Sequence, residues 1–533
     1  MATPYDYIIV GAGSAGSVLA ERLSANPNHH VLLVEEGGAA NWLSLMPKGY
    51  GKLLFDPGFS HYYPTSPGDG AHAPQEVWAR GRMLGGSSAI NGMVWTRGVP
   101  ADYDSIEASG NPGWGWSEML RVFRAIENHH LGASDYRGAG GPVTISTNPH
   151  KARLTDAFIA AAAGTGLNVK QDQNGPDQEG VGYAQWNIDA RGRRVSAARA
   201  FLDPARKRPN FTIRSGVRVD RVIVENGHAV GIAGVENGAP VEFRTAGEVI
   251  LSAGGLMSPK LLLLSGIGDA AALSALGIDV KHHSPNVGRR LREHLVLMLS
   301  FRLKQWQDSD NREYSGVRLL ANVLNYLVAG KGPMARGAAE AIAFVRALPG
   351  ANRPDAQLMF NPYSMSPAGG MKFEDEPGMQ VYSFILRPES EGSLQLTSAD
   401  PQAPLNVNPN YLATERDRAT AIAATRAIRR IMAEPALADL VVGETAKTAG
   451  AQTDEDILGL YDRFGGAGYH AVGTAGMGPN DDDVVDSRLR VRGVTGLRVA
   501  DCSVFQQIPS GNTNAPAMAL GWRLAELIEE EAR

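Results

Sequence analysis

The chain has 533 residues, of which 43% are hydrophobic and 20% are charged, and its formal net charge is −5. This composition is typical of a globular protein, and the length favours two to four domains over a single core. The weak charge and the lack of long basic tracts argue against a nucleic-acid partner, while the single cysteine excludes an internal disulfide and a cysteine-rich zinc site.

Membrane spans and leader peptides also leave no signal in the sequence. No apolar run reaches the roughly 18 to 20 residues that a bilayer span needs, and the first residues are typical of a strand instead of a cleavable leader. Adjacent histidine pairs lack further ligands at metal spacing, so no metal site is expected. We therefore expect a cytoplasmic enzyme without a membrane partner and without a bound metal.

A dinucleotide-binding βαβ unit begins the chain. An apolar strand at 5–10 runs into the sequence GAGSAG, a helical stretch follows, and a second apolar strand ends at an acid, Glu35. Gly11 permits the tight turn, Gly13 lets the backbone approach a pyrophosphate, and Gly16 lets the helix pack closely on the strand. An acid at Glu35 accepts from a free ribose hydroxyl and would repel a 2′-phosphate, which favours FAD or NAD over NADP.

A second glycine-rich run, RGRMLGGSSAINGMVWTRG, covers residues 80–98. Its small residues suit close approach of the backbone to a flat ring or a pyrophosphate. The alternative is a sharp structural turn before a helix. Helices are predicted next at 117–127, 154–166 and 195–205 from the spacing of their apolar residues.

Strand patterns dominate from residue 211 onward. Asn226 and Gly227 separate two strands and predict a tight hairpin, and the buried strand and helix of 248–268 read as a return to the nucleotide domain. Residues 299–461 combine alternating strand patterns with a helix near 419–432, which suits a separate sheet capped by helices. A last strand at 497–500 leads to a C-terminal helix.

These elements predict an α/β fold with a discontinuous Rossmann-like nucleotide domain and an inserted α+β substrate domain, whose antiparallel sheet is capped by helices. The nucleotide domain is expected at 1–150, 205–298 and 464–533. The substrate domain is expected at 151–204 and 299–463.

Four segments resemble the signatures of one family in the order in which that family has them. They are the run at 80–98, GGLMSPKLLLLSGIG at 254–268, YHAVGTAGMG at 469–478 and VADCSVFQQIPSGNTNAPAMAL at 499–520. Over essentially its whole length the chain therefore resembles the glucose-methanol-choline (GMC) oxidoreductases.

This resemblance implies FAD as the cofactor, with a substrate domain covering its isoalloxazine ring. The residues expected to hold FAD are Gly11, Gly13, Ser14, Ala15, Gly16, Glu35, Arg82, Gly85, Gly86, Ser87, Asn91, Gly92, Met93, Val94, Val219, Ala253, Asp501, Cys502, Asn512 and Thr513. Some members of the family attach the flavin through a histidine just before the asparagine of the second run. Here that position is Ile90, so noncovalent FAD is expected.

The resemblance also assigns His470 as the catalytic base and Asn512 as its hydrogen-bond partner. Flavin N5 would accept a hydride from the carbinol carbon while neutral His470 takes the hydroxyl proton. A histidine is more often a solvated or core residue, and Asn512 could instead cap the last helix. His294 lies in VGRRLREH, which departs from the family pattern at Arg290, Arg292 and Glu293, and it is given no catalytic role.

The predicted reaction is oxidation of a small or medium primary alcohol, including aryl alcohols, to the aldehyde. The substrate size follows from the segment at 114–132, which resembles bacterial members of the family. O2 is the expected electron acceptor, and a dehydrogenase that uses a quinone or carrier is the alternative. A redox-silent hydroxynitrile-type lyase and a noncatalytic FAD-binding module are weaker alternatives, and an NAD-linked dehydrogenase would not need the later glycine-rich segments.

The residues that would contact the alcohol are less clear in the sequence. Phe360, Tyr363, Met365 and Phe384 could line an apolar substrate pocket, or they could equally be core residues. The sequence leaves the oligomeric state open.

Overall fold

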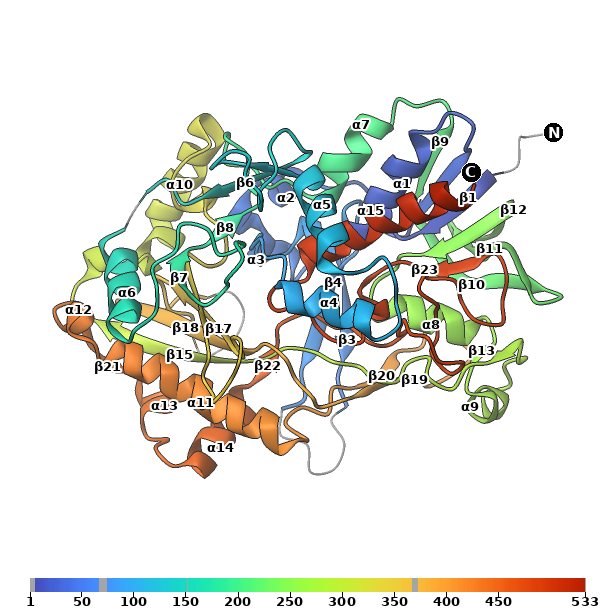
Figure 1. Ribbon diagram of the computed structural model, residues 1–533. Coiled ribbons are helices and arrows are strands. Elements are labelled where there is room, and N and C mark those ends of the chain that lie inside the picture. The colour runs from blue at the N-terminus through green and yellow to red at the C-terminus, as the bar shows by residue number, and fades with distance from the viewer. Residues whose placement is uncertain (1–4, 67–73, 151, 367–371, 533) are drawn as a thin grey trace.

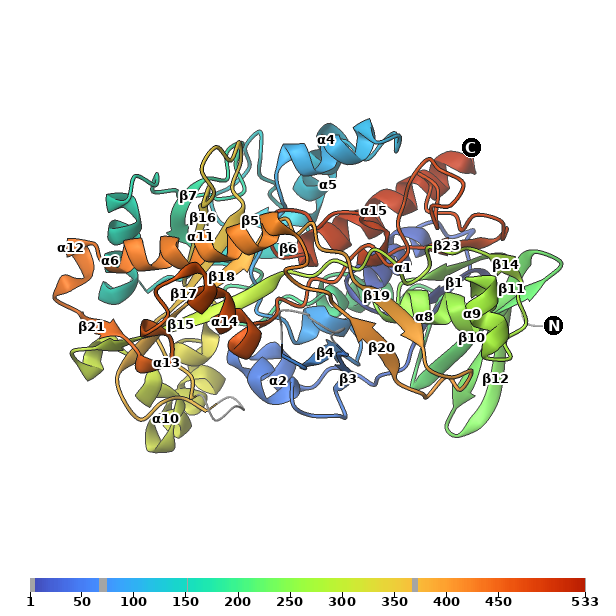
Figure 2. The same ribbon diagram turned by 90° about the horizontal axis from the view of Figure 1, so that it is seen from below.

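The computed structural model describes residues 5–66, 74–150, 152–366 and 372–532. Two large sheets organise the molecule, and they lie side by side, the first on the right and the second on the left in Figures 1 and 2. The predicted fold class is confirmed: a Rossmann-like sheet is assembled from distant segments, and an antiparallel sheet capped by helices is inserted between them.

The first sheet has the strand order β10-β11-β12-β1-β2-β9, with β23 beside β12. Its strands are β1 (Tyr5–Val10), β2 (Val31–Glu35), β9 (Phe211–Ser215), β10 (Val217–Glu225), β11 (His228–Glu236), β12 (Ala239–Leu251) and β23 (Leu497–Val499). β1 pairs in parallel with β2 and β12, and β9 and β23 extend the parallel part. Parallel strands are buried on both faces, which explains the continuous apolar runs of β1 and β2.

The predicted hairpin at Asn226 and Gly227 is confirmed. These two residues join β10 to the antiparallel β11, and both have positive φ values, 51° and 75°. A two-residue turn with both φ values positive matches the right-handed twist of the strands.

Helices pack around the first sheet, with α1 in contact with β1 and β2. α1 packs against the C-terminal helix α15, which packs in turn against α5, while α8 packs against β10. These helices are α1 (Ser14–Ser24), α4 (Pro100–Ala108), α5 (Trp116–Ile126), α7 (Asp203–Ala205), α8 (Met257–Leu264), α9 (Ala270–Ala275) and α15 (Asn514–Glu531).

The second sheet is antiparallel and has the order β21-β15-β18-β17-β16-β7, with β22 beside β15. Its strands are β7 (Gly180–Tyr183), β15 (Leu295–Leu303), β16 (Ala341–Val345), β17 (Ala356–Asn361), β18 (Gly378–Ile385), β21 (Val441–Glu444) and β22 (Gly466–Ala467). α6 and α11 pack on one face of it and bury one apolar cluster there, while the other face contributes to a second cluster that includes Met93 and Val94 of the glycine-rich run.

The helices of this half lie around that sheet. They are α6 (Arg153–Gly164), α10 (Gly316–Ala329), α11 (Glu415–Met432), α12 (Pro435–Ala438), α13 (Ala446–Ala449) and α14 (Asp454–Phe464). α10 lies at the periphery of this half in both Figure 1 and Figure 2.

Shorter elements connect the two halves. The short helices are α2 (Trp42–Leu45), α3 (Tyr50–Leu53), η1 (Pro47–Gly49), η2 (Gly86–Ala89), η3 (Ala198–Leu202), η4 (Trp306–Asp308), η5 (Asn311–Tyr314), η6 (Pro333–Ala335) and η7 (Cys502–Val504). The short strands pair as β3 (Ser60–Pro64) with β4 (Val77–Gly81), β13 (Ile267–Gly268) with β14 (His282–His283), and β19 (Ser393–Leu396) with β20 (Leu405–Asn408). β5 (Glu127–His129), β6 (Val143–Thr147) and β8 (Gln185–Trp186) form a three-stranded sheet.

The sheets depart from the expected division of the chain at a few borders. β15 begins at Leu295, four residues before the expected border, and β22 pairs with it although residues 466–467 were expected in the nucleotide domain. η3 packs on α1 of the first domain although residues 198–202 were expected in the substrate domain. Each of these elements lies at or near an expected border, whose exact position composition does not reveal.

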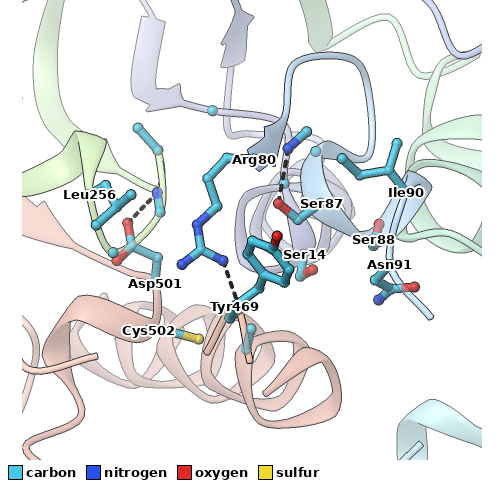
Figure 3. Close-up of a pocket in the computed structure, with 18 of the residues that line it drawn as sticks. Ser14, Arg80, Ser87, Ser88, Ile90, Asn91, Leu256, Tyr469, Asp501 and Cys502 are labelled. Carbon is cyan, nitrogen blue, oxygen red and sulfur yellow. Dashed lines mark hydrogen bonds between the residues drawn. The ribbon is translucent and has the colours of Figure 1, made fainter. Parts of the chain in front are cut away.

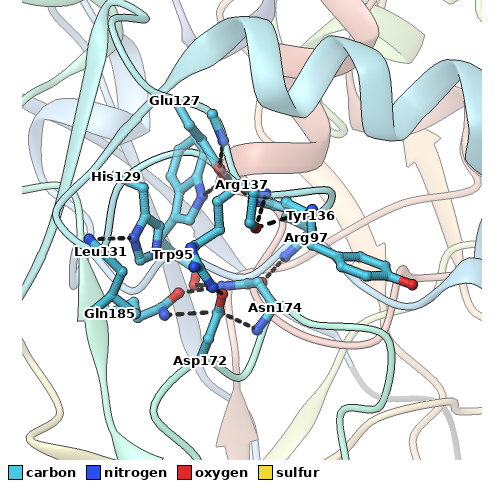
Figure 4. A network of polar contacts seen from close by, with 12 residues as sticks. Trp95, Arg97, Glu127, His129, Leu131, Tyr136, Arg137, Asp172, Asn174 and Gln185 are labelled. Carbon is cyan, nitrogen blue, oxygen red and sulfur yellow. Dashed lines mark hydrogen bonds and ion pairs between the residues drawn. The ribbon is translucent and has the colours of Figure 1, made fainter.

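A buried polar network joins the two halves near α5 (Figure 4). Arg97 and Trp95 donate from Nε and Nε1 to the same Oε1 of Glu127, each at 2.7 Å. Asn174 donates to the side chain of Gln185 at 2.6 Å and to the carbonyl of Trp95 at 3.1 Å. The network therefore ties residues 95–127 of the first half to residues 174–185 of the second.

Candidate active site

A cavity of about 410 Å³ is lined by residues of four stretches, 10–94, 217–261, 468–471 and 501–517, together with Ala338 of the second half. Figure 3 shows that its walls come from the two glycine-rich runs, the loop after β12, and the segments around Tyr469 and Asp501. Of the residues expected to hold FAD, the lining includes Gly11, Gly13, Ser14, Ala15, Glu35, Arg82, Gly86, Ser87, Asn91, Gly92, Met93, Val94, Val219, Ala253, Asp501, Cys502, Asn512 and Thr513. Gly16 and Gly85 are not among the lining residues.

The first glycines bring backbone segments into contact at one end of this cavity. A Cβ on Gly11, whose φ is +101°, would lie 2.5 Å from the carbonyl oxygen of Ser252, and one on Gly16 would lie 2.0 Å from the carbonyl of Gly11. Gly86 approaches Gly13 so closely that its Cβ would lie 2.8 Å from the Cα of Gly13. Gly16 therefore serves the helix–strand contact, as its place in the motif predicts.

The N-terminus of α1 opens at the same end of the cavity. Its N-cap residue is Gly13, which has no side chain to satisfy the free N–H groups of the first turn. Gly13, Ser14 and Ala15 all line the cavity. Free N–H groups together with the positive end of the helix dipole form a site for an anion such as a phosphate.

Two consecutive acids lie near this glycine turn. Glu35 accepts backbone N–H groups on both oxygens, from Ala12 at 2.9 Å and from Gly37 at 2.8 Å. Its burial raises its pKa to about 7, despite these two donors. Glu36, which the sequence did not single out, also lines the cavity and pairs with His61 at 2.8 Å and Arg82 at 3.3 Å.

Side chains hold the backbone of neighbouring wall segments (Figure 3). Arg80 donates from Nη1 to the carbonyl of Tyr469 at 2.6 Å, and Ser87 accepts from the N–H of Gly81 at 3.1 Å. Asp501 accepts from the N–H of Gly254 at 2.9 Å. These contacts join the first signature segment to the third and the second to the fourth.

His470 is a buried histidine, only 8% exposed, at this wall. Its Nε2 lies 3.1 Å from Nδ2 of Asn512, and its Nδ1 lies 2.9 Å from Nδ1 of His294. Burial lowers the pKa of His470 well below its ordinary value, and the neighbouring His294 and Arg80 lower it further. The imidazole is therefore neutral near pH 7, which leaves one ring nitrogen able to accept a proton.

Asn512 faces His470 and does not cap the last helix. The N-cap of α15 is Thr513, and the side chain of Asn512 also accepts at Oδ1 from Nε2 of Gln357 at 3.2 Å. Asn514, the first residue of α15, accepts from Ser14 Oγ at 2.8 Å. The structure thus brings the two predicted catalytic residues together, although 42 residues separate them.

The four residues suggested for substrate contact lie in different places. The ring of Phe384 lies 6.1 Å from that of His470. Phe360 instead stacks on Phe158 at 4.6 Å, on the helix-covered face of the second sheet. That position corrects the expectation for Phe360, because β17 alternates its side chains and directs Gln357, not Phe360, to the side of His470.

The remaining two residues belong to an apolar cluster near η6 and α10. Tyr363 packs edge-on against Tyr314 at 5.7 Å, with the ammonium of Lys48 4.8 Å above its ring. Met365 packs at the edge of the same cluster. Neither residue is among those that line the cavity, so the structure does not bring them to His470.

Sequence reasoning missed three residues beside His470. His294 contacts its ring, Glu293 accepts its backbone N–H at 2.6 Å, and Gln357 orients Asn512. The signal for His294 was present, since it ends a segment that aligns with a family pattern. Gln357 carried no local signal, being one of two polar residues in an otherwise apolar strand.

Two kinds of feature are absent from the part of the chain that the structure describes. In residues 5–66, 74–150, 152–366 and 372–532, no helix is both long and apolar enough to span a bilayer. In the same residues, no three histidine, cysteine, aspartate or glutamate side chains are grouped so that they could hold a metal ion.

Comparison with known proteins gives matches along the whole chain. Residues 5–296 match the N-terminal part and residues 388–521 the C-terminal part of the GMC oxidoreductase family model. The oxygen-dependent choline dehydrogenase of Photobacterium profundum is 38% identical over 99% of this chain and 93% of its own length. The alcohol dehydrogenase [acceptor] of Pseudomonas putida is 35% identical over 98% of this chain and 95% of its own length.

Solved structures show the same fold. Pyridoxine 4-oxidase from Mesorbium loti superposes with a TM-score of 0.88 at 31% identity, covering 99% of both chains. An FAD-dependent oxidoreductase from Chaetomium thermophilum gives a TM-score of 0.88 at 26% identity, covering 99% of this chain and 100% of that one.

Proposed function

This chain belongs to the GMC oxidoreductase family, whose members use FAD to oxidise CH–OH groups, and we propose that it oxidises a small or medium primary alcohol, including aryl alcohols, to the aldehyde. One observation carries the proposal. Nε2 of the neutral, buried His470 meets the amide of Asn512 at 3.1 Å on the wall of the cavity. A base and a hydrogen-bond donor at one point are what removal of a hydroxyl proton requires.

The residues at the glycine-rich end of the cavity fit FAD. The uncapped N-terminus of α1 at Gly13 suits the pyrophosphate, and the close approach of Gly86 to Gly13 leaves no side chain in that position. Each carboxylate oxygen of Glu35 keeps a lone pair for a ribose hydroxyl beyond the backbone N–H that it accepts. When bound, the flavin supplies the hydride acceptor.

His470 and Asn512 divide the work on the alcohol between them. His470 accepts the hydroxyl proton at Nε2, and its low pKa keeps this atom unprotonated near neutral pH. Asn512 presents its Nδ2 donor beside that atom, where it can stabilise the developing alkoxide. Burial of His470 strengthens these interactions, because little water competes for its ring nitrogens.

Replacing the base tests this assignment directly. His470→Ala should slow anaerobic reduction of the flavin by ~10² to 10⁴-fold, the usual contribution of a positioned base, while FAD stays bound. The measurement is bleaching of the flavin absorption after rapid mixing with choline, benzyl alcohol or straight-chain primary alcohols. His150→Ala, at an exposed histidine, is the matched control.

Two outcomes would contradict the proposal. If His470→Ala bleached at the wild-type rate, His470 would not be the base. If none of the alcohols bleached the wild-type flavin while one of them was still consumed, the reaction would be redox-silent, as in a lyase. The alcohol that bleaches fastest would also define the substrate class.

We also propose that FAD is held without a covalent bond. The side chain at the attachment position is Ile90, which has no nucleophilic atom and lines the cavity beside Asn91. Acid precipitation should therefore release a yellow supernatant and leave a colourless pellet. A yellow pellet would require covalent attachment through another residue.

The electron acceptor is proposed to be O2, with a quinone or protein carrier as the second candidate. The first candidate agrees with the name of the oxygen-dependent choline dehydrogenase, and the second with that of the alcohol dehydrogenase [acceptor]. Stoichiometric release of hydrogen peroxide under air would support O2. Turnover only with an artificial acceptor would support the carrier.

A further inference from the structure

A chain of four hydrogen bonds crosses the active site and passes through His470. Nε2 of Gln357 lies 3.2 Å from Oδ1 of Asn512, whose Nδ2 lies 3.1 Å from Nε2 of His470. On the other side of the ring, Nδ1 of His470 lies 2.9 Å from Nδ1 of His294, whose Nε2 lies 2.9 Å from the carbonyl oxygen of Leu386. At one end of this hydrogen-bond chain, Gln357 lies in β17 of the second sheet. At the other end, Leu386 directly follows β18 of the same sheet.

At one end of the hydrogen-bond chain, the carbonyl of Leu386 determines which ring nitrogens of His294 and His470 carry hydrogen. A carbonyl oxygen only accepts, so Nε2 of His294 must carry a hydrogen. His294 is completely buried, and burial lowers its pKa to about 4, so its ring is neutral and its Nδ1 is a bare acceptor. The 2.9 Å contact between the two Nδ1 atoms then requires the hydrogen to be on His470.

At the other end of the hydrogen-bond chain, Gln357 determines the orientation of the Asn512 side-chain amide. The nitrogen of Gln357 donates to Oδ1 of Asn512, so Nδ2 of Asn512 faces His470 as a donor. A donor facing Nε2 of His470 requires an acceptor there. The two ends therefore agree on one arrangement, in which every hydrogen in the chain points from Gln357 toward Leu386.

We propose that His294 is a positioning residue, which holds the proton of His470 on Nδ1 and so keeps Nε2 unprotonated and able to accept the hydroxyl proton of the alcohol. This inference deepens the proposed function and rests on it, because a tautomer matters for the reaction only if His470 is the base. Which nitrogen of a histidine carries the proton is set by the hydrogen bond that the other nitrogen makes.

The alternative tautomer of His470 would be inactive for a physical reason. A hydrogen on Nε2 would oppose the N–H of Asn512, donor against donor, and would leave no lone pair toward the cavity. A histidine base with its proton on the wrong nitrogen cannot take a proton from its substrate. Without the acceptor at His294, no other hydrogen-bond partner of Nδ1 is found among the described residues.

Isotope-labelled histidine makes the tautomer visible in the holoenzyme by NMR, since long-range nitrogen–proton correlations distinguish Nδ1–H from Nε2–H. The signal of His470 is identified by its loss in His470→Ala. We expect Nδ1–H in the wild type and a substantial fraction of Nε2–H in His294→Leu. His294→Asn, whose Oδ1 is an acceptor close to the position of Nδ1, should keep Nδ1–H.

Phe384→Leu separates this role from a packing role. The ring of Phe384 packs against both imidazoles, at 6.4 Å from His294 and 6.1 Å from His470, but takes no part in the hydrogen-bond chain. Its variant should leave Nδ1–H in place. In His294→Leu, anaerobic flavin reduction should fall by about 2- to 10-fold, the factor that one net hydrogen bond contributes to an equilibrium.

The possible results distinguish failure of this proposal from failure of the proposed function. Nε2–H in the wild type, or an unchanged tautomer and unchanged flavin reduction in His294→Leu, would overturn the proposal. The wild-type spectrum alone tests the proton arrangement if His294→Leu does not fold. If His470→Ala reduced its flavin normally, the proposed function would fail, although the measured tautomer would still show what His294 holds.

Discussion

At the scale of single residues, one buried carboxylate fixes the backbone around both imidazoles. Oε1 of Glu293 accepts from the N–H of His470 at 2.6 Å and from the N–H of His294 at 2.8 Å. Arg80 lies 3.5 Å from the other oxygen and also donates to the carbonyl of Tyr469. The two rings thus meet because a single side chain anchors both peptide segments.

The low pKa of His470 predicts how flavin reduction depends on pH. Its ring is neutral at and below the ordinary histidine pKa of 6.5, since burial, His294 and Arg80 all disfavour the charged form. Anaerobic flavin reduction should therefore stay constant as the pH falls through 6.5, and the loss of rate should begin only at lower pH. Rapid-mixing measurements with the best alcohol of the panel test this, and an acid limb centred at or above 6.5 would contradict it.

Glu293 predicts a pH dependence of stability. Burial raises its pKa from 4.5 to about 7, outweighing the nearby Arg80 and the two N–H donors. Between these pH values the folded protein holds a proton that the unfolded chain has lost, so stability falls as the pH rises. At 1.36 kcal/mol per pKa unit, the loss through this group is at most about 3 kcal/mol.

Glu293→Gln should remove that part of the loss. Urea unfolding of the holoenzyme at the two ends of the window should show a smaller decrease in the free energy of unfolding than in the wild type. Glu455→Gln, at an exposed glutamate of α14, is the control and should keep the wild-type decrease. Equal decreases in Glu293→Gln and the wild type would mean that Glu293 is ionised throughout.

At the scale of elements, α10 is unusual because most of its apolar side chains are exposed. Val317, Leu320, Leu324, Leu327 and Val328 are 60 to 82% exposed, while Tyr326 is 7% exposed and donates to the carbonyl of Leu45 at 3.2 Å. Tyr326 is the only buried residue of this helix. The position of the helix therefore depends mainly on that one side chain and on the partly buried Leu319 and Val323.

This arrangement predicts a large effect on stability for one substitution and a small effect for another, although the two positions lie within one helical turn. Tyr326→Ala should lower the free energy of unfolding by about 2 to 4 kcal/mol, because it leaves a cavity and removes the hydrogen bond to Leu45. Leu324→Ser, at a side chain that is 62% exposed, should change it by less than about 0.5 kcal/mol. Chemical unfolding compares the two, and similar losses would mean that the outer face of α10 is covered in solution.

At the scale of the whole molecule, the network around Arg97 and Glu127 ties the two halves together (Figure 4). Both side chains are fully buried. Removing one partner of a buried ion pair leaves an uncompensated charge, which usually costs about 3 to 5 kcal/mol. Glu127→Gln should therefore destabilise the protein by about that amount in chemical unfolding.

An exposed pair beside the same helix provides the control. Glu118 pairs with Arg121 at 3.2 Å, and both side chains are 42 to 50% exposed. Exposed pairs contribute about 0 to 1 kcal/mol, so Glu118→Gln should have little effect. A small effect of Glu127→Gln as well would mean that Arg97 is compensated by other groups in the network.

Sequence patterns predicted the fold class and most of the cavity wall because their physics is local. A glycine turn between a buried strand and a helix has one main structural outcome, and the hairpin at Asn226 and Gly227 follows from two residues alone. It was harder to predict which face of the sheet each side chain of a strand occupies. Gln357 and Phe360 both lie in β17, and only the register of the sheet decides which of them faces His470.

The sequence by itself determined the nucleotide-binding unit and the family, and it singled out His470 and Asn512, because each is carried by a short motif. The tertiary structure alone decided what surrounds His470. His294 lies 176 residues from His470, and Gln357 lies 155 residues from Asn512. A hydrogen bond depends on atoms coming within about 3 Å. Such contacts between distant segments arise only in the folded chain, where β15 pairs with β22 beside the two histidines and β17 meets the segment before α15.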